Sequence, residues 1–281
     1  MRVTNKNILV SILLVCLAPF YNCVHSQNMA DTLLTDNSQT INKDDKLTSP
    51  ENNISNFQDS ASTKFNAKRL ILPGALILAG AIGAIDHDNN LNKSVNEAMT
   101  DLSHNKQFKA DDYLRFVPSA AHLLMGSLGI KSRHNFKERL LVSATAHAAM
   151  LAMGYGTKFI IHEQRPDMSD NHSLPSGHVA MAFTGAELLR EEYGTLYGIA
   201  GYTIATGVAF LRLYNNRHWF NDVIMGAGIG ILSARIGFWL LPLERKLFKI
   251  NQQSPQAAIV TAIPVYSPTH HAIMLSMNAV F

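Results

Sequence analysis

Three short polar segments of this sequence, at residues 158–166, 175–178 and 212–222, carry side chains suited to chemistry on an anionic group. Together they hold three cations, two imidazoles and one carboxylate: Lys158, Arg165, Arg212, His178, His218 and Asp222. Guanidinium groups bind phosphate oxygens through two parallel hydrogen bonds. Such a set of side chains would stabilise the charge that develops on a phosphoryl group during its transfer.

The two histidines suggest a nucleophile and an acid. Asp222 follows His218 by four residues, which places its carboxylate within reach of the imidazole. A carboxylate bonded to one ring nitrogen fixes the tautomer and leaves the other nitrogen free to attack phosphorus. We therefore predict His218 as the nucleophile and Asp222 as its orienting group. His178 is predicted to protonate the leaving alcohol and then to activate water.

Ser176 and Gly177 stand at the expected start of a helix, where backbone N–H groups and the helix dipole favour an anion. With the three cations they complete the predicted phosphate-binding set: Lys158, Arg165, Ser176, Gly177 and Arg212.

Six apolar segments must position these residues, and each is expected to form a helix. They cover residues 70–85, 116–130, 140–156, 179–189, 196–211 and 223–241. If neighbouring helices are antiparallel, the third helix ends, the fourth begins, the fifth ends and the sixth begins at the same end of the bundle. The sequence therefore predicts an all-α bundle of about six core helices with the active site at one end.

The N-terminal residues 1–26 are typical of a secretory signal peptide, with a basic start, an apolar run and a small residue, Ser26, at the end. An uncleaved anchor is the alternative. The cysteines of the chain, Cys16 and Cys23, both fall in this segment. The mature chain would then have no disulfide and no thiol nucleophile.

The remaining chain divides into three predicted parts. Residues 27–66 are polar and lack apolar periodicity, which indicates a flexible leader. Residues 67–250 form the helical domain. Residues 251–281 contain two β-prone runs around a Ser-Pro-Thr-His-His sequence and predict a short C-terminal β-hairpin.

The composition favours membrane contact and gives no support for nucleic-acid binding. Charged residues make up 16% of the chain, below the roughly 25% of an average soluble protein, and the net charge is only +3. Most apolar runs are shorter than the about 20 residues of a membrane span. Three arrangements stay open: the first apolar run is an anchor, one later segment does not cross, or the bundle is periplasmic and lies against the membrane.

The three polar segments resemble the signature of the type 2 phosphatidic acid phosphatase superfamily, which includes bacterial class A acid phosphatases and vanadium haloperoxidases. That signature is Lys, six residues, Arg-Pro; then Pro-Ser-Gly-His; then Ser-Arg, five residues, His, three residues and Asp. The matching residues are Lys158, Arg165, Pro166, Pro175, Ser176, Gly177, His178, Arg212, His218 and Asp222. The resemblance covers roughly residues 67–245.

The resemblance implies a phosphatase that acts without a metal or other cofactor through a phosphohistidine. The short link between Pro166 and Pro175 resembles that of envelope lipid-phosphate phosphatases more than that of soluble acid phosphatases. We therefore expect a lipid phosphate as substrate, contact with the membrane, and an active site that faces the periplasm. No protein partner is evident.

One residue departs from the signature, because Leu211 stands where the family has Ser. The missing hydroxyl would remove one phosphate contact and weaken the activity. Two other functions stay open. The signal peptide and the short helices favour a soluble periplasmic acid phosphatase of broad specificity, and Leu211 favours a catalytically weak scaffold that binds anions. A haloperoxidase has no further support.

Other residues have simpler interpretations. His122, His147 and His172 are expected in the core, and His162 on the surface. The glycines of residues 226–230 predict close helix packing rather than a nucleotide loop, because no strand precedes them.

Overall fold

The computed structural model describes residues 63–85, 90–104, 106–250, 259–267 and 272–280. The predicted signal peptide and most of the predicted leader lie outside these residues. The elements are η1 (Ala67–Leu70), α3 (Ile71–Ile85), α4 (Asn90–Ser103), α5 (Asp111–Leu114), α6 (Val117–Leu124), η2 (Met125–Leu128), α7 (Phe136–Ile160), α8 (Gly177–Tyr193), α9 (Thr195–Tyr214) and α10 (Phe220–Leu247). Two strands follow, β1 (Ile259–Ser267) and β2 (Ala272–Val280), which pair antiparallel with Ile259 opposite Val280.

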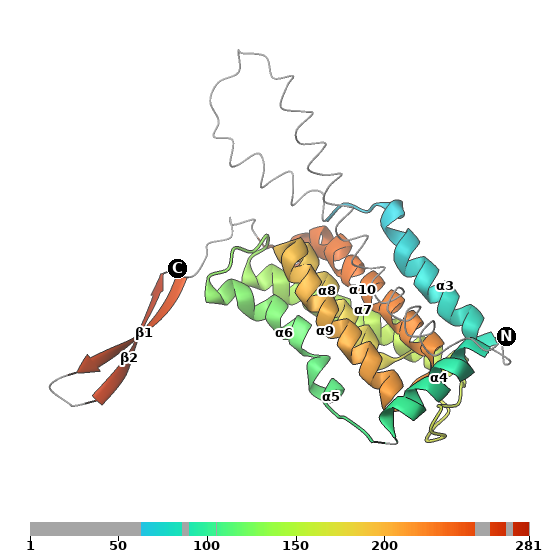
Figure 1. Ribbon diagram of the computed structural model, residues 1–281. Helices are drawn as coiled ribbons and strands as arrows, with labels where there is room; N and C mark the ends of the chain where they lie inside the picture. The colour runs from blue at the N-terminus through green and yellow to red at the C-terminus, as the bar shows by residue number, and fades with distance from the viewer. Residues whose placement is uncertain (1–62, 86–89, 105, 251–258, 268–271, 281) are drawn as a thin grey trace, which may run out of the picture.

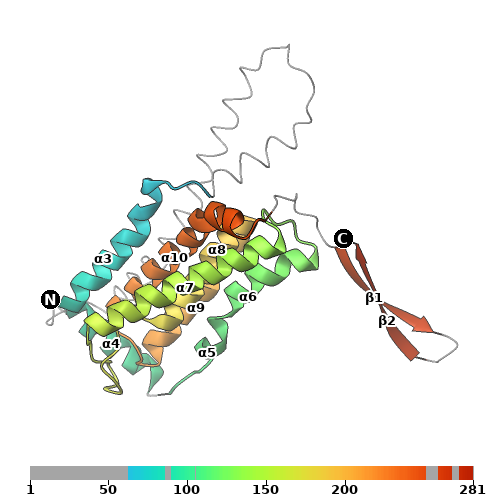
Figure 2. The same cartoon turned by 180° about the vertical axis from the view of Figure 1, so that it is seen from behind.

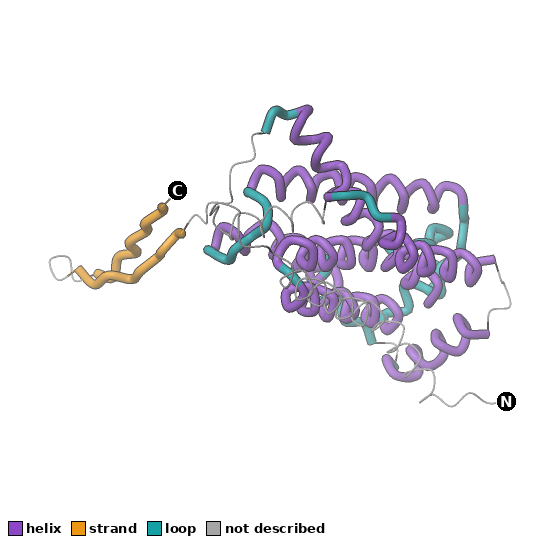
Figure 3. The backbone as a smooth tube through the Cα atoms, turned by 90° about the horizontal axis from the view of Figure 1, so that it is seen from above, coloured by secondary structure: helices purple, strands orange, loops and turns teal. Residues whose placement is uncertain are grey.

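The helical fold class is confirmed, and each of the six apolar segments lies mainly in helix. The long helices run side by side (Figure 3). The number of core helices, the domain boundaries and the hairpin as part of the fold stay predictions. Helix α4 was not predicted because its composition is polar, but Val95 and Met99, four residues apart, are both buried against the main core.

Helix α10 lies between α3, α7 and α8 and packs on all three (Figure 1). Its glycines allow this close approach. A Cβ on Gly226 would lie 2.7 Å from the Ser176 carbonyl oxygen, and one on Gly230 would lie 2.5 Å from that of Ala180, both on the α8 side. A Cβ on Gly228 would meet the Pro73 carbonyl of α3 at 2.8 Å. The prediction of close helix packing is confirmed.

The substitution Gly230→Ala is expected to lower the free energy of unfolding by about 1–3 kcal/mol, because the added methyl group would force α10 away from the α8 backbone. Gly207→Ala in α9 is the matched control, since a Cβ there meets no atom within 4 Å. That variant is expected to be as stable as the wild type or more so. Urea titrations of both variants in detergent would measure the difference.

A buried group of charges joins α8 to α10 inside the bundle. Glu187 is fully buried and accepts hydrogen bonds from Arg235 Nε at 2.7 Å, from Arg190 Nε at 2.7 Å and from Tyr202 Oη at 2.6 Å. Arg235 therefore faces the interior of the bundle. Glu187 lies ten residues after Gly177, about 15 Å along α8 from the start of the helix. Because this group of charges is far from the polar segments at the helix start, we assign it a structural role.

The four histidines whose burial was predicted outside the site differ in exposure. His122 is fully buried and His147 is half-buried, while His162 and His172 are exposed. The core prediction was therefore wrong for His172. It lies in the loop after α7, where backbone carbonyls and polar side chains keep the chain at the surface, and its own carbonyl binds Lys158.

His122 makes the stability of the fold sensitive to acid. Its ring nitrogens have no hydrogen-bond partner within the described residues, and burial lowers its pKa to about 4. Between pH 6.5, its ordinary pKa, and pH 4 the unfolded chain binds a proton that the folded protein does not, so stability falls as the pH falls through this window. The shift corresponds to about 3 kcal/mol.

The substitution His122→Leu is therefore expected to flatten the decline of the thermal midpoint between pH 7 and pH 5. At pH 7 it should be neutral or stabilising, because it removes a buried polar ring without a partner. Thermal unfolding of both proteins across this pH range would check the result. An unchanged slope would contradict the assignment of acid sensitivity to His122.

Within the described residues, three helical stretches are long and apolar enough to cross a membrane: 67–85, α9 and α10. These three stretches differ in how much of their surface is buried by the rest of the protein. Only 11% of the apolar window of the first is buried inside the protein, against 72% for α10. Helix α3 lies at one side of the bundle (Figures 1 and 2) and exposes Ile71, Leu78, Ile82 and Ile85 by 64–77%. Helix α3 therefore offers an apolar outer face.

Candidate active site

The three polar segments lie at the same end of the bundle. Helix α7 ends at Ile160, the 161–176 loop follows, and the loop between α9 and α10 approaches it from the other side. Figures 1 and 2 show this end together with α4 and α5. The Ser176 N–H donates to the Asp222 carbonyl at 3.0 Å, which ties the start of α8 to the first turn of α10.

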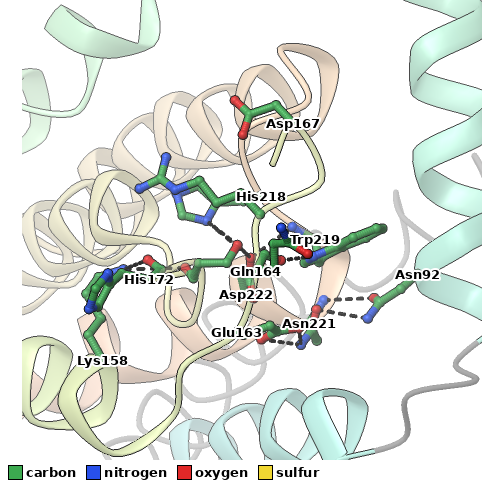
Figure 4. A network of polar contacts seen from close by, with 12 residues as sticks. Asn92, Lys158, Glu163, Gln164, Asp167, His172, His218, Trp219, Asn221 and Asp222 are labelled. Carbon is green, nitrogen blue, oxygen red and sulfur yellow. Dashed lines mark hydrogen bonds and ion pairs between the residues drawn. The ribbon is translucent and has the colours of Figure 1, made fainter. Parts of the chain in front are cut away.

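His218 and Asp222 form the predicted pair. His218 Nδ1 lies 3.2 Å from Asp222 Oδ2, the imidazole is 4% exposed, and the carboxylate is fully buried (Figure 4). The same carboxylate oxygen accepts the Trp219 N–H at 2.9 Å and the Ser173 hydroxyl. These bonds hold the carboxylate on Nδ1, so that Nε2 is the ring nitrogen left for another contact.

The three predicted cations surround this pair. Burial, and after it the charges of Arg212, Arg165 and Lys158, lower the pKa of His218 well below its ordinary value. His218 is therefore neutral near pH 7, and a neutral imidazole has the lone pair that a nucleophile needs.

Each cation is held by a different partner. Lys158 Nζ donates to the carbonyls of His172 and Ser173 (Figure 4), and Arg165 Nε donates to Asp170 Oδ1 at 2.9 Å. Arg212 is buried and Nη1 donates to Asp111 Oδ2 at 2.7 Å. Loop and helix contacts thus fix the cations at the end of the bundle.

Ser176 and Gly177 lie where the helix begins, with Ser176 as the residue that precedes α8. The Ser176 hydroxyl is fully buried and, like Arg212 Nε, has no hydrogen-bond partner within the described residues. Gly177 is exposed, and a Cβ there would meet no atom within 4 Å. A buried hydroxyl and a buried guanidinium N–H are therefore available to an anion at this site.

His178, in the first turn of α8, lies in a different environment. Its Nε2 is 2.9 Å from Asp112 Oδ1, and its Nδ1 is 3.3 Å from Arg115 Nη1. Burial and the Arg212 charge lower the pKa of His178 to about 4, although the hydrogen bond to Asp112 acts in the opposite direction. All of the predicted site residues thus meet at one end of the bundle; their roles stay predictions.

Comparison with known proteins gives the family of the central segment. Residues 140–246 match the family model of the PAP2 superfamily. We call residues 140–246 the PAP2 segment. The resemblance predicted from the three polar segments is confirmed there, and the PAP2 segment contains every residue of the predicted site.

The chain is also similar to the lipid A 1-phosphatase of Porphyromonas gingivalis. The two are 40% identical over 139 residues, which make up 48% of this chain and 31% of that protein. The chain thus spans about a third of the length of the curated relative it matches. No solved structure matches the chain.

Two polar residues in the PAP2 segment were missed in the sequence. Ser173 is fully buried beside His218 and Asp222, but a lone serine in a loop gives no signal. Glu163 accepts two hydrogen bonds from Asn221 Nδ2, at 3.0 and 3.3 Å, and Asn221 exchanges hydrogen bonds with Asn92 of α4 (Figure 4). Helix α4 is therefore bonded to the start of α10, directly after the predicted nucleophile.

A gap too small for a water molecule lies between α4 and the predicted nucleophile. Its lining comes from α4 and from the end of α9 to the start of α10: Asn92, Val95, Asn96, Met99, Leu213, His218, Trp219 and Phe220. Because α4 precedes the PAP2 segment, the surroundings of His218 include residues outside the matched range.

A possible metal ligand set was also missed. Among the described residues, Asp111, Asp112 and His178 each place one ligand atom within 4.8 Å of the others. Asp111 already binds the Arg212 guanidinium, and Arg115 lies against the His178 ring. The guanidinium groups of Arg212 and Arg115 lie against these candidate ligands and would repel a divalent cation. Asp112 and His178 therefore fit an acid–base pair better than a metal site.

Proposed function

We propose that this chain is a phosphatase that hydrolyses a lipid-linked phosphate monoester or diphosphate in the cell envelope. The reaction would pass through a phosphohistidine on His218 and would need no metal. The observation that carries the proposal is the buried His218–Asp222 pair, which has a neutral imidazole among Arg212, Arg165 and Lys158. We choose a lipid substrate for this proposal because a relative of the chain is named lipid A 1-phosphatase.

In the first step, His218 Nε2 would attack phosphorus while the bond from phosphorus to the ester oxygen breaks. His178 would donate a proton to that oxygen, and the alcohol would leave. In the second step, water would attack the phosphohistidine, His178 would accept a proton from it, and inorganic phosphate would leave with His218 restored. Arg212, Arg165, Lys158 and the start of α8 would stabilise the phosphoryl charge in both steps.

The outer face of α3 supports a lipid substrate and membrane association. An apolar helix face of this kind matches the hydrocarbon of a bilayer better than water. The proposed orientation places the site at the periplasmic surface, where a phosphate headgroup would enter the cation cluster and the acyl chains would stay in the membrane.

The test is phosphate release by the detergent-solubilised protein in the presence of EDTA. The substrates are phosphatidate, a polyprenyl diphosphate, lipid A and 4-nitrophenyl phosphate. Release from any lipid in EDTA would support the proposal. Hydrolysis of the aryl phosphate alone would favour the soluble acid phosphatase instead.

A protein that cleaves no substrate would favour the anion-binding scaffold, with Leu211 as its cause. The variant Leu211→Ser restores the family hydroxyl. A gain of activity in this variant would assign the defect to that position.

A further inference from the structure

We propose that Asp112 is a positioning residue for His178, which holds Nε2–H so that Nδ1 faces the leaving-group oxygen. The 2.9 Å contact between Asp112 Oδ1 and Nε2 carries this inference. It rests on the proposed function, in which His178 is the general acid. Asp112 lies outside the segment of residues 140–246 that matches the PAP2 superfamily.

The short helix α5 that carries Asp112 is anchored to the end of α9. Asp111 is 1% exposed and accepts from Arg212 Nη1 at 2.7 Å and from Asn215 Nδ2 at 3.1 Å. Asn215 also bonds the backbone of Phe108 in both directions, at 2.8 and 2.9 Å. The position of Asp112 is therefore set by buried contacts on its neighbour, even though its own side chain is half-exposed.

Helix α5 contacts two predicted site residues through neighbouring carboxylates. Asp111 holds the Arg212 guanidinium, whereas Asp112 holds the His178 imidazole. Adjacent residues of one helical turn thus orient a predicted phosphate ligand and the predicted acid. A shift of α5 would move both groups together.

The charges that face His178 explain why a carboxylate is needed to stabilise its protonated form. Asp112, Asp111 and Arg115 face the ring from α5 and its C-terminal end, and Arg212 faces it from α9. The guanidinium groups and burial oppose the imidazolium, while the two carboxylates favour it. The hydrogen bond to His178 in turn lowers the pKa of Asp112, so this carboxylate stays ionised near pH 7.

The proton path follows from the ring geometry. With Nε2–H on Asp112, the proton that reaches the ester oxygen must come from Nδ1 of a doubly protonated His178. The bound phosphoester, as an anion, would favour this imidazolium, which burial and Arg212 disfavour in the free protein. In the structure Arg115 Nη1 lies 3.3 Å from Nδ1 and donates to the neutral ring, so this contact must give way when Nδ1 takes up its proton. After the ester bond breaks, the neutral ring keeps Nε2–H and can accept a water proton at Nδ1.

The experiment compares Asp112→Asn with the wild type on two phosphoesters, dodecyl phosphate and 4-nitrophenyl phosphate. A nitrophenolate leaves without an acid, whereas an alkoxide does not. We expect kcat/KM to fall by about 30- to 100-fold for the alkyl ester and by less than about threefold for the aryl ester. The alkaline limb of the alkyl-ester pH profile should move to lower pH, because the variant imidazolium loses its carboxylate. Asp101→Asn, at an exposed position of α4, is the matched control and should change neither ester.

A second comparison uses His178→Gln, in which the proposed acid is absent. In that background Asp112→Asn should have almost no further effect on the alkyl ester. Equal losses on both esters, or an undiminished loss in the His178→Gln background, would overturn the positioning role and indicate a structural one. A wild-type protein that cleaves neither ester and none of the lipid phosphates named above would overturn the proposed function itself and, with it, this inference.

Discussion

Replacement of His218 by alanine is expected to reduce phosphate release by at least about a thousandfold on every substrate. The variant would lack the nitrogen that attacks phosphorus, and no cysteine stands in the chain after Cys23 to replace it. Phosphate release in single-turnover conditions would measure the loss. Trapping of labelled phosphate on the wild-type protein at alkaline pH, and none on the variant, would identify the intermediate.

The control for this substitution is His162→Ala. His162 lies in the first polar segment but is exposed, and its ring contacts only that of His172 among the aromatic neighbours described. Its activity should stay within about twofold of the wild type, as is usual for surface positions. If His218→Ala retained more than about a tenth of the wild-type rate, a nucleophile other than His218 would be needed.

The second large effect is expected for Asp222→Asn, with kcat about 10³- to 10⁴-fold lower and KM little changed. The amide can accept the Trp219 N–H and the Ser173 hydroxyl, so the local backbone should persist. What the variant loses is the charge that fixes Nδ1–H of His218 and stabilises the positive ring in the transition state. The measurement is a separation of kcat from KM, together with the thermal midpoint.

Asp167→Asn is the matched control, because Asp167 lies in the loop at the same end and pairs with Arg217. Removal of that partly exposed pair should cost little stability and change kcat by less than about threefold. A large fall in the thermal midpoint of Asp222→Asn would instead show that the carboxylate acts mainly as a helix cap.

The central site could be predicted because its geometry is local or follows from helix order. The spacing of four residues places Asp222 beside His218, and the alternation of helix direction brings the three polar segments together. The same reasoning could not find Asp112, because its partner His178 is 66 residues away and α5 has only four residues. Nothing in its local pattern indicates where a short helix will dock.

Exposure was harder to predict than helix formation. His122 and His172 were both expected in the core, but His122 is fully buried in α6 and His172 lies exposed in the loop after α7. Likewise, the apolar residues of α3 and α10 give similar patterns, although α3 is largely uncovered and α10 largely buried. The packing of distant helices decides these differences, and periodicity within one helix does not contain that information.

The buried pair of Glu187 and Arg235 bears on how α10 joins the bundle during synthesis. The chain is made from its N-terminus, so α8 emerges before α10, and 48 residues separate the two partners. At about 5–20 residues per second, this gap lasts roughly 2–10 seconds. During it, Arg190 on the same helix can neutralise Glu187. When Arg235 arrives, it meets a carboxylate that is already in place, so the longest apolar helix need not carry an unpaired charge into the bundle.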